Sequence, residues 1–170
     1  KLNKITVRIG RLPSSGYASE VVVDQNFASA NNLDLGDKVD AIIYGRKFRL
    51  DIVGIGSSPE FIFTLGPGDL LPDEERFGVF WMNAKALESA TDRIGAVNTV
   101  SIALSKNARE PDVISKVDSL TQKYGGTGAF GRKYHLSHAF LSNELKQLES
   151  LTTVIPPVFL LVAVFLVYVV

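Results

Sequence analysis

The last 20 residues form the most apolar stretch of the chain. Residues 151–170 run LTTVIPPVFLLVAVFLVYVV and contain no charged side chain. A helix rises about 1.5 Å per residue and the hydrocarbon core of a bilayer is about 30 Å thick, so roughly 20 apolar residues can cross it. A buried core helix would show a polar stripe, whereas residues 158–170 offer only the Tyr168 hydroxyl. The pattern therefore predicts a transmembrane helix.

The helical pattern starts before this apolar stretch, at about Ser137. Side chains recur there at alternating spacings of four and three residues, which is typical of a heptad seam on one helix face. The seam residues are Leu141, Leu145, Leu148, Thr152 and Ile155. No glycine or turn cluster intervenes, so we predict one continuous helix, a stalk at 136–150 entering the membrane at 151–170. Leu141, Leu145 and Leu148 are the candidate coupling residues of this stalk.

Pro156 and Pro157 lie inside the predicted continuous helix. Each proline removes one backbone donor, and prolines are the commonest cause of sharp helix kinks. We therefore predict a kink close to the membrane surface.

The first 96 residues show the short alternating runs that are typical of strands separated by turns. Strands are expected at 1–10, 20–24, 39–44, 48–55 and 77–82, and short helices at 25–32 and 83–90. Gly45-Arg46-Lys47 is the expected hairpin connection between the third and fourth strands. Residues 1–96 are therefore predicted to be a β-rich subdomain.

Residues 97–135 show a different order of elements. Two expected strands, at 97–104 and 127–133, flank a helix that opens at Glu110-Pro111 and ends at Gly125. This order predicts a subdomain that contains a βαβ-like unit. The expected fold class is α+β, with the β-rich subdomain beside the βαβ-containing one, followed by the stalk and the start of the transmembrane helix.

An apolar cluster lies in the irregular, proline-containing segment 57–75. Its members are Phe61, Ile62, Phe63 and Leu65. Such a cluster belongs either to the core or to a contact surface for a partner. Both interpretations stay open, and these four residues are the candidate partner surface.

The charge balance argues against nucleic-acid binding. The chain has 18 Lys and Arg and 18 Asp and Glu residues, so its net charge is zero, and it has no long basic run. Phosphate backbones are bound mainly through excess positive charge. The absence of cysteine excludes disulfides and thiolate metal sites. The chain begins at Lys1 without a leader pattern, so we expect any signal or upstream span to lie outside this sequence.

No motif predicts catalysis or a cofactor. The G-x-G-x-x-G match at 126–131 follows a helix rather than a strand, so we interpret it as a turn and strand edge. His135 and His138 lack a zinc-site pattern and are expected at a solvated helix start. We therefore predict no catalytic, cofactor-binding or metal-binding residues in the chain.

An acidic group lies in the proline-containing segment. It consists of Asp69, Asp73, Glu74 and Glu75. The spacing of a calcium-binding loop is missing, which favours a solvated loop. A membrane-anchored hydrolase that uses Asp69 and Asp73, or the two histidines, is kept as an alternative hypothesis.

Several short motifs follow one another in a characteristic order. They are Gly10-Arg11-Leu12-Pro13, Glu20-Val21-Val22-Val23, Phe27-Ala28, Leu35-Gly36-Asp37, Ile52-Val53-Gly54-Ile55, Ser58-Pro59-Glu60-Phe61-Ile62, Phe77-Gly78-Val79-Phe80-Trp81-Met82, Gly95-Ala96-Val97-Asn98 and Leu141-Ser142-Asn143-Glu144-Leu145. Over nearly the whole chain this order resembles the extracytoplasmic domain, the MacB-like periplasmic core, of FtsX/MacB-type ABC transporter permeases.

The resemblance implies a permease subunit of the bacterial inner membrane, with this domain outside the cytoplasm and between the first and second spans. It implies that the chain passes motion from a cytoplasmic ABC ATPase to extracytoplasmic work such as export or the handling of lipoproteins or lipids. The expected partners are that ATPase, the membrane, an extracytoplasmic adaptor or lipoprotein, and a second permease module in a dimer. ATP would be bound by the ATPase, and the chain itself would have no enzyme activity. The alternative is a membrane-anchored sensor or partner-binding domain with a single span.

Overall fold

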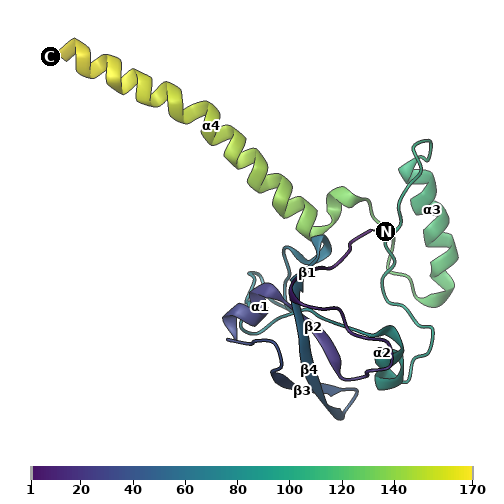
Figure 1. Ribbon diagram of the computed structural model, residues 1–170. Helices are drawn as coiled ribbons and strands as arrows, with labels where there is room; N and C mark the ends of the chain where they lie inside the picture. Colours follow the sequence, from purple (N-terminus) through teal and green to yellow (C-terminus); the bar gives the residue numbers. More distant parts are fainter. Residues whose placement is uncertain (1, 170) are drawn as a thin grey trace. The chain divides into compact units, whose positions relative to one another are not determined.

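The computed structural model describes residues 2–169. The chain divides into two units, Lys1–Ala108 and Arg109–Val170. Within the described residues, all strands and two short helices lie in the first unit, and the second unit is helical (Figure 1). The α+β class expected from the sequence is confirmed.

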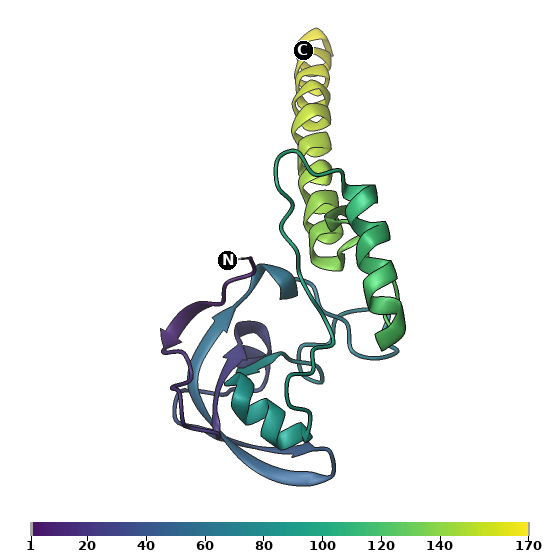
Figure 2. The ribbon, with the colours of Figure 1, turned by 90° about the vertical axis from the view of Figure 1, so that its right-hand side faces the viewer.

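A curled mixed sheet forms the first unit. Its five strands in the described residues are β1 (Thr6–Gly10), β2 (Glu20–Asp24), β3 (Lys38–Ile43), β4 (Arg46–Ser57) and β5 (Phe80–Met82). The order is β1-β4-β2-β5, and β3 also pairs with β4. The strand β4 is long enough to pair with three other strands. Its first half pairs antiparallel with β3, and its last four residues pair antiparallel with β1. The strand β2 runs parallel to residues 51–56 of β4. Figure 2 shows β4 as a long, bent strand.

The core lies around β2, because this strand has a neighbour on both sides. Val21, Val22 and Val23 are fully buried, and Ile52 of β4 is 1% exposed. A strand covered on both faces is expected to be a continuous apolar run, and β-branched side chains suit the pleated sheet. These residues therefore account for both the strand and its central place.

Two short helices flank the sheet, α1 (Gln25–Ala30) and α2 (Ala84–Thr91). The Asp24 carboxylate caps α1 by accepting a hydrogen bond from the Asn26 N–H at 3.0 Å. Phe27 of α1 packs edge-on against Phe80 of β5, with ring centroids 5.4 Å apart. The Asn83 side chain caps α2 through the Lys85 N–H at 3.0 Å, which confirms the predicted helix start.

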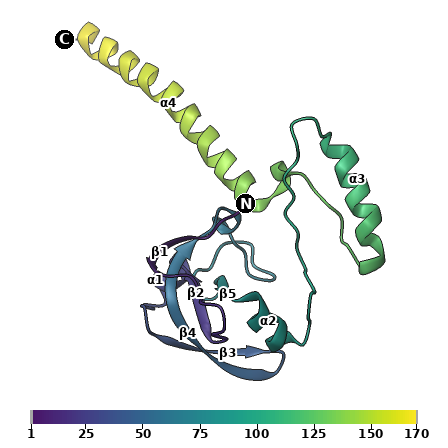
Figure 3. The ribbon, with the colours of Figure 1, turned by 45° about the vertical axis from the view of Figure 1, so that its right-hand side comes forward.

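Figure 3 shows the hairpin formed by β3 and β4. Its turn lies one residue earlier than predicted. Ile43 pairs with Arg46, so the loop consists of Tyr44 and Gly45, whose φ angles are 49° and 77°. Positive φ at both loop positions is the signature of the type I′ turn, which matches the twist of the flanking strands. Arg46 and Lys47 belong to β4, so the prediction that they form the connection is wrong.

The two strands predicted around the third helix are absent from the described residues. Residues 97–104 are irregular, as is most of 127–133, where Arg132–Tyr134 forms a short 3-10 turn. The helix between them, α3 (Glu110–Thr121), does form, with Pro111 in its first turn. The prediction of a βαβ-like unit is corrected, because alternation produces a strand only where a neighbouring backbone supplies its hydrogen bonds.

The last helix, α4, runs unbroken from Leu136 to Val169 over 34 residues (Figure 1). The predicted continuous helix is therefore confirmed, and it continues through Pro156 and Pro157. The hydroxyls of Thr152 and Thr153 both donate to the Glu149 carbonyl, at 2.8 and 3.0 Å. The predicted kink at the prolines stays a prediction.

Candidate functional site

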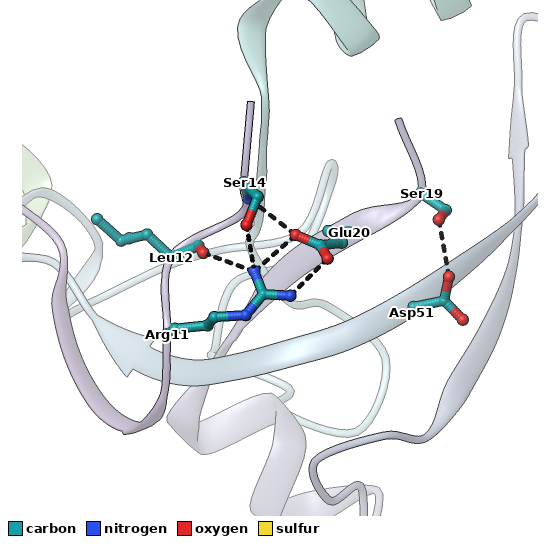
Figure 4. Close-up of polar contacts among 6 residues, drawn as sticks. All are labelled: Arg11, Leu12, Ser14, Ser19, Glu20 and Asp51. Carbon is teal, nitrogen blue, oxygen red and sulfur yellow. Dashed lines mark hydrogen bonds and ion pairs between the residues drawn. The ribbon is translucent and has the colours of Figure 1, made fainter. Parts of the chain in front are cut away.

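The most elaborate polar network of the first unit joins the loop after β1 to the start of β2 (Figure 4). Arg11 holds Glu20 in a bidentate pair, with Nη1 2.7 Å from Oε2 and Nη2 2.5 Å from Oε1. The Ser14 N–H donates to the same carboxylate at 2.8 Å, and Arg11 Nη1 also donates to the Ser14 hydroxyl at 2.8 Å. Glu20 is 6% exposed, so its charge is balanced almost entirely by these groups.

The local backbone directs Arg11 toward Glu20. Gly10 has a φ of 82°, and a Cβ at this position would lie 2.3 Å from the Val53 carbonyl oxygen. The chain can therefore turn beside β4 only with glycine here. The Arg11 N–H then donates to that same Val53 carbonyl at 2.9 Å, which fixes the start of the loop.

The electrostatics of this network favour a structural role. The hydrogen bonds from Arg11 and then from the Ser14 backbone lower the pKa of Glu20 to about 2, and the pair raises the pKa of Arg11. A general base works best with a pKa near the operating pH, and this carboxylate is far below it. Glu20 is thus a fixed anion that ties residues 11–14 to the central strand.

Two further carboxylates hold the hairpin and its neighbours. The Ser19 hydroxyl donates to Asp51 at 2.7 Å and lowers the pKa of Asp51, with Lys38 adding to the effect. Asp40 lies 2.8 Å from Lys47 Nζ and 3.1 Å from Arg49 Nε, and these contacts lower its pKa. The Asp40 pairs are largely exposed, so they align the strands more than they stabilise the fold.

The apolar loop cluster proposed as a partner surface is partly packed. Phe61 meets Trp81 of β5 edge-on, with centroids 6.1 Å apart, while Phe63 and Leu65 are half-buried. Ile62 is 49% exposed. A role of this cluster in partner binding stays a prediction.

The same loop exposes two leucines that the sequence reasoning did not select. Leu70 is 93% exposed and Leu71 is 76% exposed, which makes them the most solvent-accessible apolar side chains of this segment. The sequence could have indicated this exposure, because the leucine pair is followed by Pro72 and an acidic run. A leucine pair at a polar loop tip has no local core to enter.

The acidic residues of this loop line an open hollow of about 710 Å³ together with the two leucines. Their carboxylates serve local structure: Asp73 accepts from the Glu75 and Arg76 N–H groups at 3.2 and 3.1 Å, and Glu74 accepts from the Asn26 side chain at 2.9 Å. Residues 2–169 contain no group of three or more His, Cys, Asp or Glu side chains placed to hold a metal ion.

The two histidines and the glycine motif lie near the start of α4. His135 follows the Arg132–Tyr134 turn, and its carbonyl accepts the first bond of α4 from the Ala139 N–H at 2.9 Å. His138 is in the first turn of the helix, and both histidines are half-buried. The glycine motif is irregular backbone with Gly128 at a φ of 108°, and no strand edge forms there.

The predicted coupling residues lie on the stalk part of α4. Leu141 is 42% exposed, and Leu145 and Leu148 are each 57% exposed. From Asn143 to Val169 every residue of the helix is exposed. In the described part of the chain, α4 is the one helix that is long and apolar enough to cross a membrane.

No family model matches the chain, and no curated protein or solved structure matches it. The choice among functions therefore depends on the geometry of α4, on the chemistry of the first unit, and on the motif order described from the sequence.

Proposed function

We propose that this chain is the extracytoplasmic domain of an FtsX/MacB-type ABC permease subunit of the bacterial inner membrane. In this role it couples ATP hydrolysis by a separate cytoplasmic ATPase to work outside the membrane, such as export or the handling of lipoproteins or lipids. The observation that supports the proposal most is α4, a single 34-residue helix whose first part is amphipathic and whose last part is apolar.

An anchor alone would not need such a helix. The apolar stretch starts at Leu151, yet the helix begins at Leu136, which adds about 22 Å of stalk at 1.5 Å per residue. A flexible linker would tether the domain equally well but would absorb any displacement. A continuous helix carries displacement along its axis, because its backbone hydrogen bonds join each turn to the next.

In this proposal the first unit is a body that is moved and has no enzyme activity of its own. Its most buried carboxylate, Glu20, stays ionised, and the positive charge of Arg11 balances its negative charge. In the proposal the chain binds no cofactor or nucleic acid. Its partners are the ATPase, the membrane, a second permease module, and an adaptor or lipoprotein that meets the apolar loop around Ile62.

The test uses the full-length protein purified with the ATPase that accompanies it and reconstituted in lipid nanodiscs. A spin label on Leu70→Cys is suitable because Leu70 is 93% exposed and these 170 residues contain no cysteine that would take up a second label. The distance between the labels of two permease modules is expected to change when ATP replaces ADP. In the double variant Leu145→Asp/Leu148→Asp, ATP hydrolysis should continue while this change is lost.

The matched control is Asn143→Asp/Ser150→Asp, which adds the same two charges off the leucine seam. It should behave like the unchanged protein. Failure of any ATPase to accompany the full-length protein would refute the proposal, and so would a label movement that persists in the leucine variant. A full-length protein with a single span and no ATPase would favour the sensor or partner-binding alternative.

A further inference from the structure

A pocket of about 200 Å³, here called the α2 pocket, lies in the first unit where α2 meets β4 and β5. Phe48, Leu50 and Met82 line it from the strands, and Ala86 and Ala90 line it from one face of α2. Protein interiors contain few voids larger than a water molecule, so the short alanine side chains leave a gap that the unit itself does not fill. A cavity of about 150 Å³ can hold a benzene-sized group, so the α2 pocket has room for one leucine side chain.

The rim of the α2 pocket is positively charged. Arg46 and Arg49 both line it, and none of the described residues that line it is acidic. Outside the pocket, Arg46 pairs with Asp92, while Arg49 and Lys47 share Asp40, so three cations face two carboxylates. An apolar side chain that enters this pocket is therefore favoured when its own neighbours are negatively charged.

The loop at 68–75, here called the leucine loop, carries the complementary pattern. Leu70 is 93% exposed and Leu71 is 76% exposed. The carboxylates on either side of them are Asp69, Asp73, Glu74 and Glu75. A protruding leucine between carboxylates matches an apolar pocket with a positive rim in both size and charge.

The leucine loop and the α2 pocket of one chain lie at opposite ends of β2. Ser19, which lines the pocket, directly precedes β2. Asp24 ends β2 and leads into α1, where the Asn26 side chain donates to Glu74 of the leucine loop at 2.9 Å. Figure 3 shows α1 and α2 on opposite sides of β2. The five residues of β2 span about 16 Å, so the loop is held away from the pocket of its own chain.

We propose that the leucine loop of one copy of this chain docks on a second copy, with Leu70 seated in the α2 pocket and the loop carboxylates facing Arg46 and Arg49. Two copies related by a two-fold axis make this contact twice. Each contact is small, so it acts between chains that already share a membrane, where tethering raises their effective concentration. The inference rests on the proposed function, which brings two permease modules together, and it names the surfaces through which their extracytoplasmic domains meet.

The test is disulfide cross-linking between two single-cysteine forms of the 170-residue chain in phosphatidylcholine vesicles. One form carries Leu71→Cys, next to the seated leucine, and the other carries Ser89→Cys at the pocket and an affinity tag that identifies the mixed dimer by size. A disulfide requires the two Cβ atoms to come within about 4.5 Å. The mixed disulfide should form at least about fivefold faster than the one between Leu71→Cys and Val100→Cys, an exposed site away from the pocket.

Two changes in the leucine loop test the leucine and the charges, each introduced beside Leu71→Cys. Leu70→Ser should slow the cross-link about tenfold, because the contact loses the burial of one apolar side chain. Asp69→Asn/Glu75→Gln should slow it about fivefold, because the attraction to the arginines is weakened. The control Ile94→Ser removes a side chain of the same unit that is 89% exposed, and it should leave the rate unchanged.

A change in the α2 pocket tests the same contact from the other side. Ala86→Leu in the Ser89→Cys form should slow the cross-link about tenfold, because the larger side chain fills the pocket. The fluorescence of Trp81 reports whether this variant is folded, and Leu70→Ser, at an exposed position, decides the outcome if it is not.

Equal cross-linking rates with Ser89→Cys and Val100→Cys would overturn the inference, and so would a rate that Leu70→Ser leaves unchanged. The experiment contains no ATPase. A failed cross-link therefore overturns only the inference, whereas the absence of a co-purifying ATPase overturns only the proposed function.

Discussion

The same residue types behave in opposite ways in β2 and in α4. Val21, Val22 and Val23 of β2 are fully buried by the chain itself, whereas the valines and leucines of α4 between Val154 and Val169 are at least 47% exposed. A strand with a neighbour on each side is enclosed by its own unit, but a long helix of apolar residues needs surroundings that the described chain does not supply. The comparison separates the part that folds around its own core from the helix that is long and apolar enough to cross a membrane.

The largest effect is expected when a charge is placed in the enclosed strand β2. Val22→Asp should destabilise the first unit by about 4 kcal/mol or more, because an unpaired carboxylate would enter a fully buried site. Trp81 is the chain's single tryptophan and pairs with Val22 across β2 and β5, so its fluorescence in detergent-solubilised protein reports this unfolding directly.

A valine at an exposed position provides the control. Val100→Asp makes the same chemical change at a site that is 67% exposed, and it should change the stability by less than about 0.5 kcal/mol. A similar loss in both variants would mean that residues 97–104 are buried in solution and that β2 is not the distinctive element.

The next effect comes from the ion pair between the enclosed Glu20 and the half-exposed Arg11. Arg11→Met should lower the thermal midpoint at pH 7 by roughly 10 °C, since Glu20 would lose its bidentate partner while remaining enclosed. Arg49→Met, which breaks a largely exposed pair with Asp40, should have a much smaller effect. Equal shifts in the two variants would contradict the role given to burial.

The pH dependence provides an independent check on Glu20. Its pKa falls from an ordinary 4.5 to about 2 in the fold, so the ionised form is favoured by folding. The resulting stability is complete above about pH 4.5 and is lost as the pH falls toward 2. Thermal unfolding followed by Trp81 fluorescence between pH 7 and pH 2 should show this loss in the unchanged chain. Glu20→Gln should flatten the profile in that window.

The smallest expected effect tests a helix that depends on local bonds. Asn83→Ala removes the side-chain cap of α2 and should cost about 1 kcal/mol of stability in urea unfolding. Asn143→Ala changes the same residue type on the exposed face of α4, and the Trp81 signal should not respond to it. A loss below 0.2 kcal/mol at Asn83 would show that packing of Ala90, not capping, holds α2.

Local signals were read correctly from the sequence. The helix that starts at residue 83 and the unbroken helix from Leu136 depend on neighbours within a few residues, so the local sequence predicts them. Residues 97–104 alternate as a strand does, but a strand needs a partner that its own sequence does not specify, and no pairing forms in the described residues. The hairpin turn begins at Tyr44, which adopts a positive φ that is rare for tyrosine. A prediction that relied on Gly45 as the turn signal therefore placed the turn one residue too late.

The Arg11–Glu20 pair was missed although a signal was available. The two residues are nine positions apart and lie on either side of a turn-rich segment, where no periodicity links them. Glu20, however, directly precedes the apolar run Val21-Val22-Val23, and a carboxylate that enters a buried strand requires a cationic partner. Arg11 is the basic residue nearest before it in the chain.

Pro156 and Pro157 limit how deeply α4 can insert into a membrane. A helical carbonyl normally accepts from the N–H four residues later, so the carbonyls of Thr152 and Thr153 lack their usual donors where these prolines follow. Open carbonyls are costly in hydrocarbon and are readily satisfied by water or lipid head groups. In a helix that crosses the membrane as proposed, this pair of carbonyls belongs at the interface, and it fixes how far the helix can slide into the bilayer.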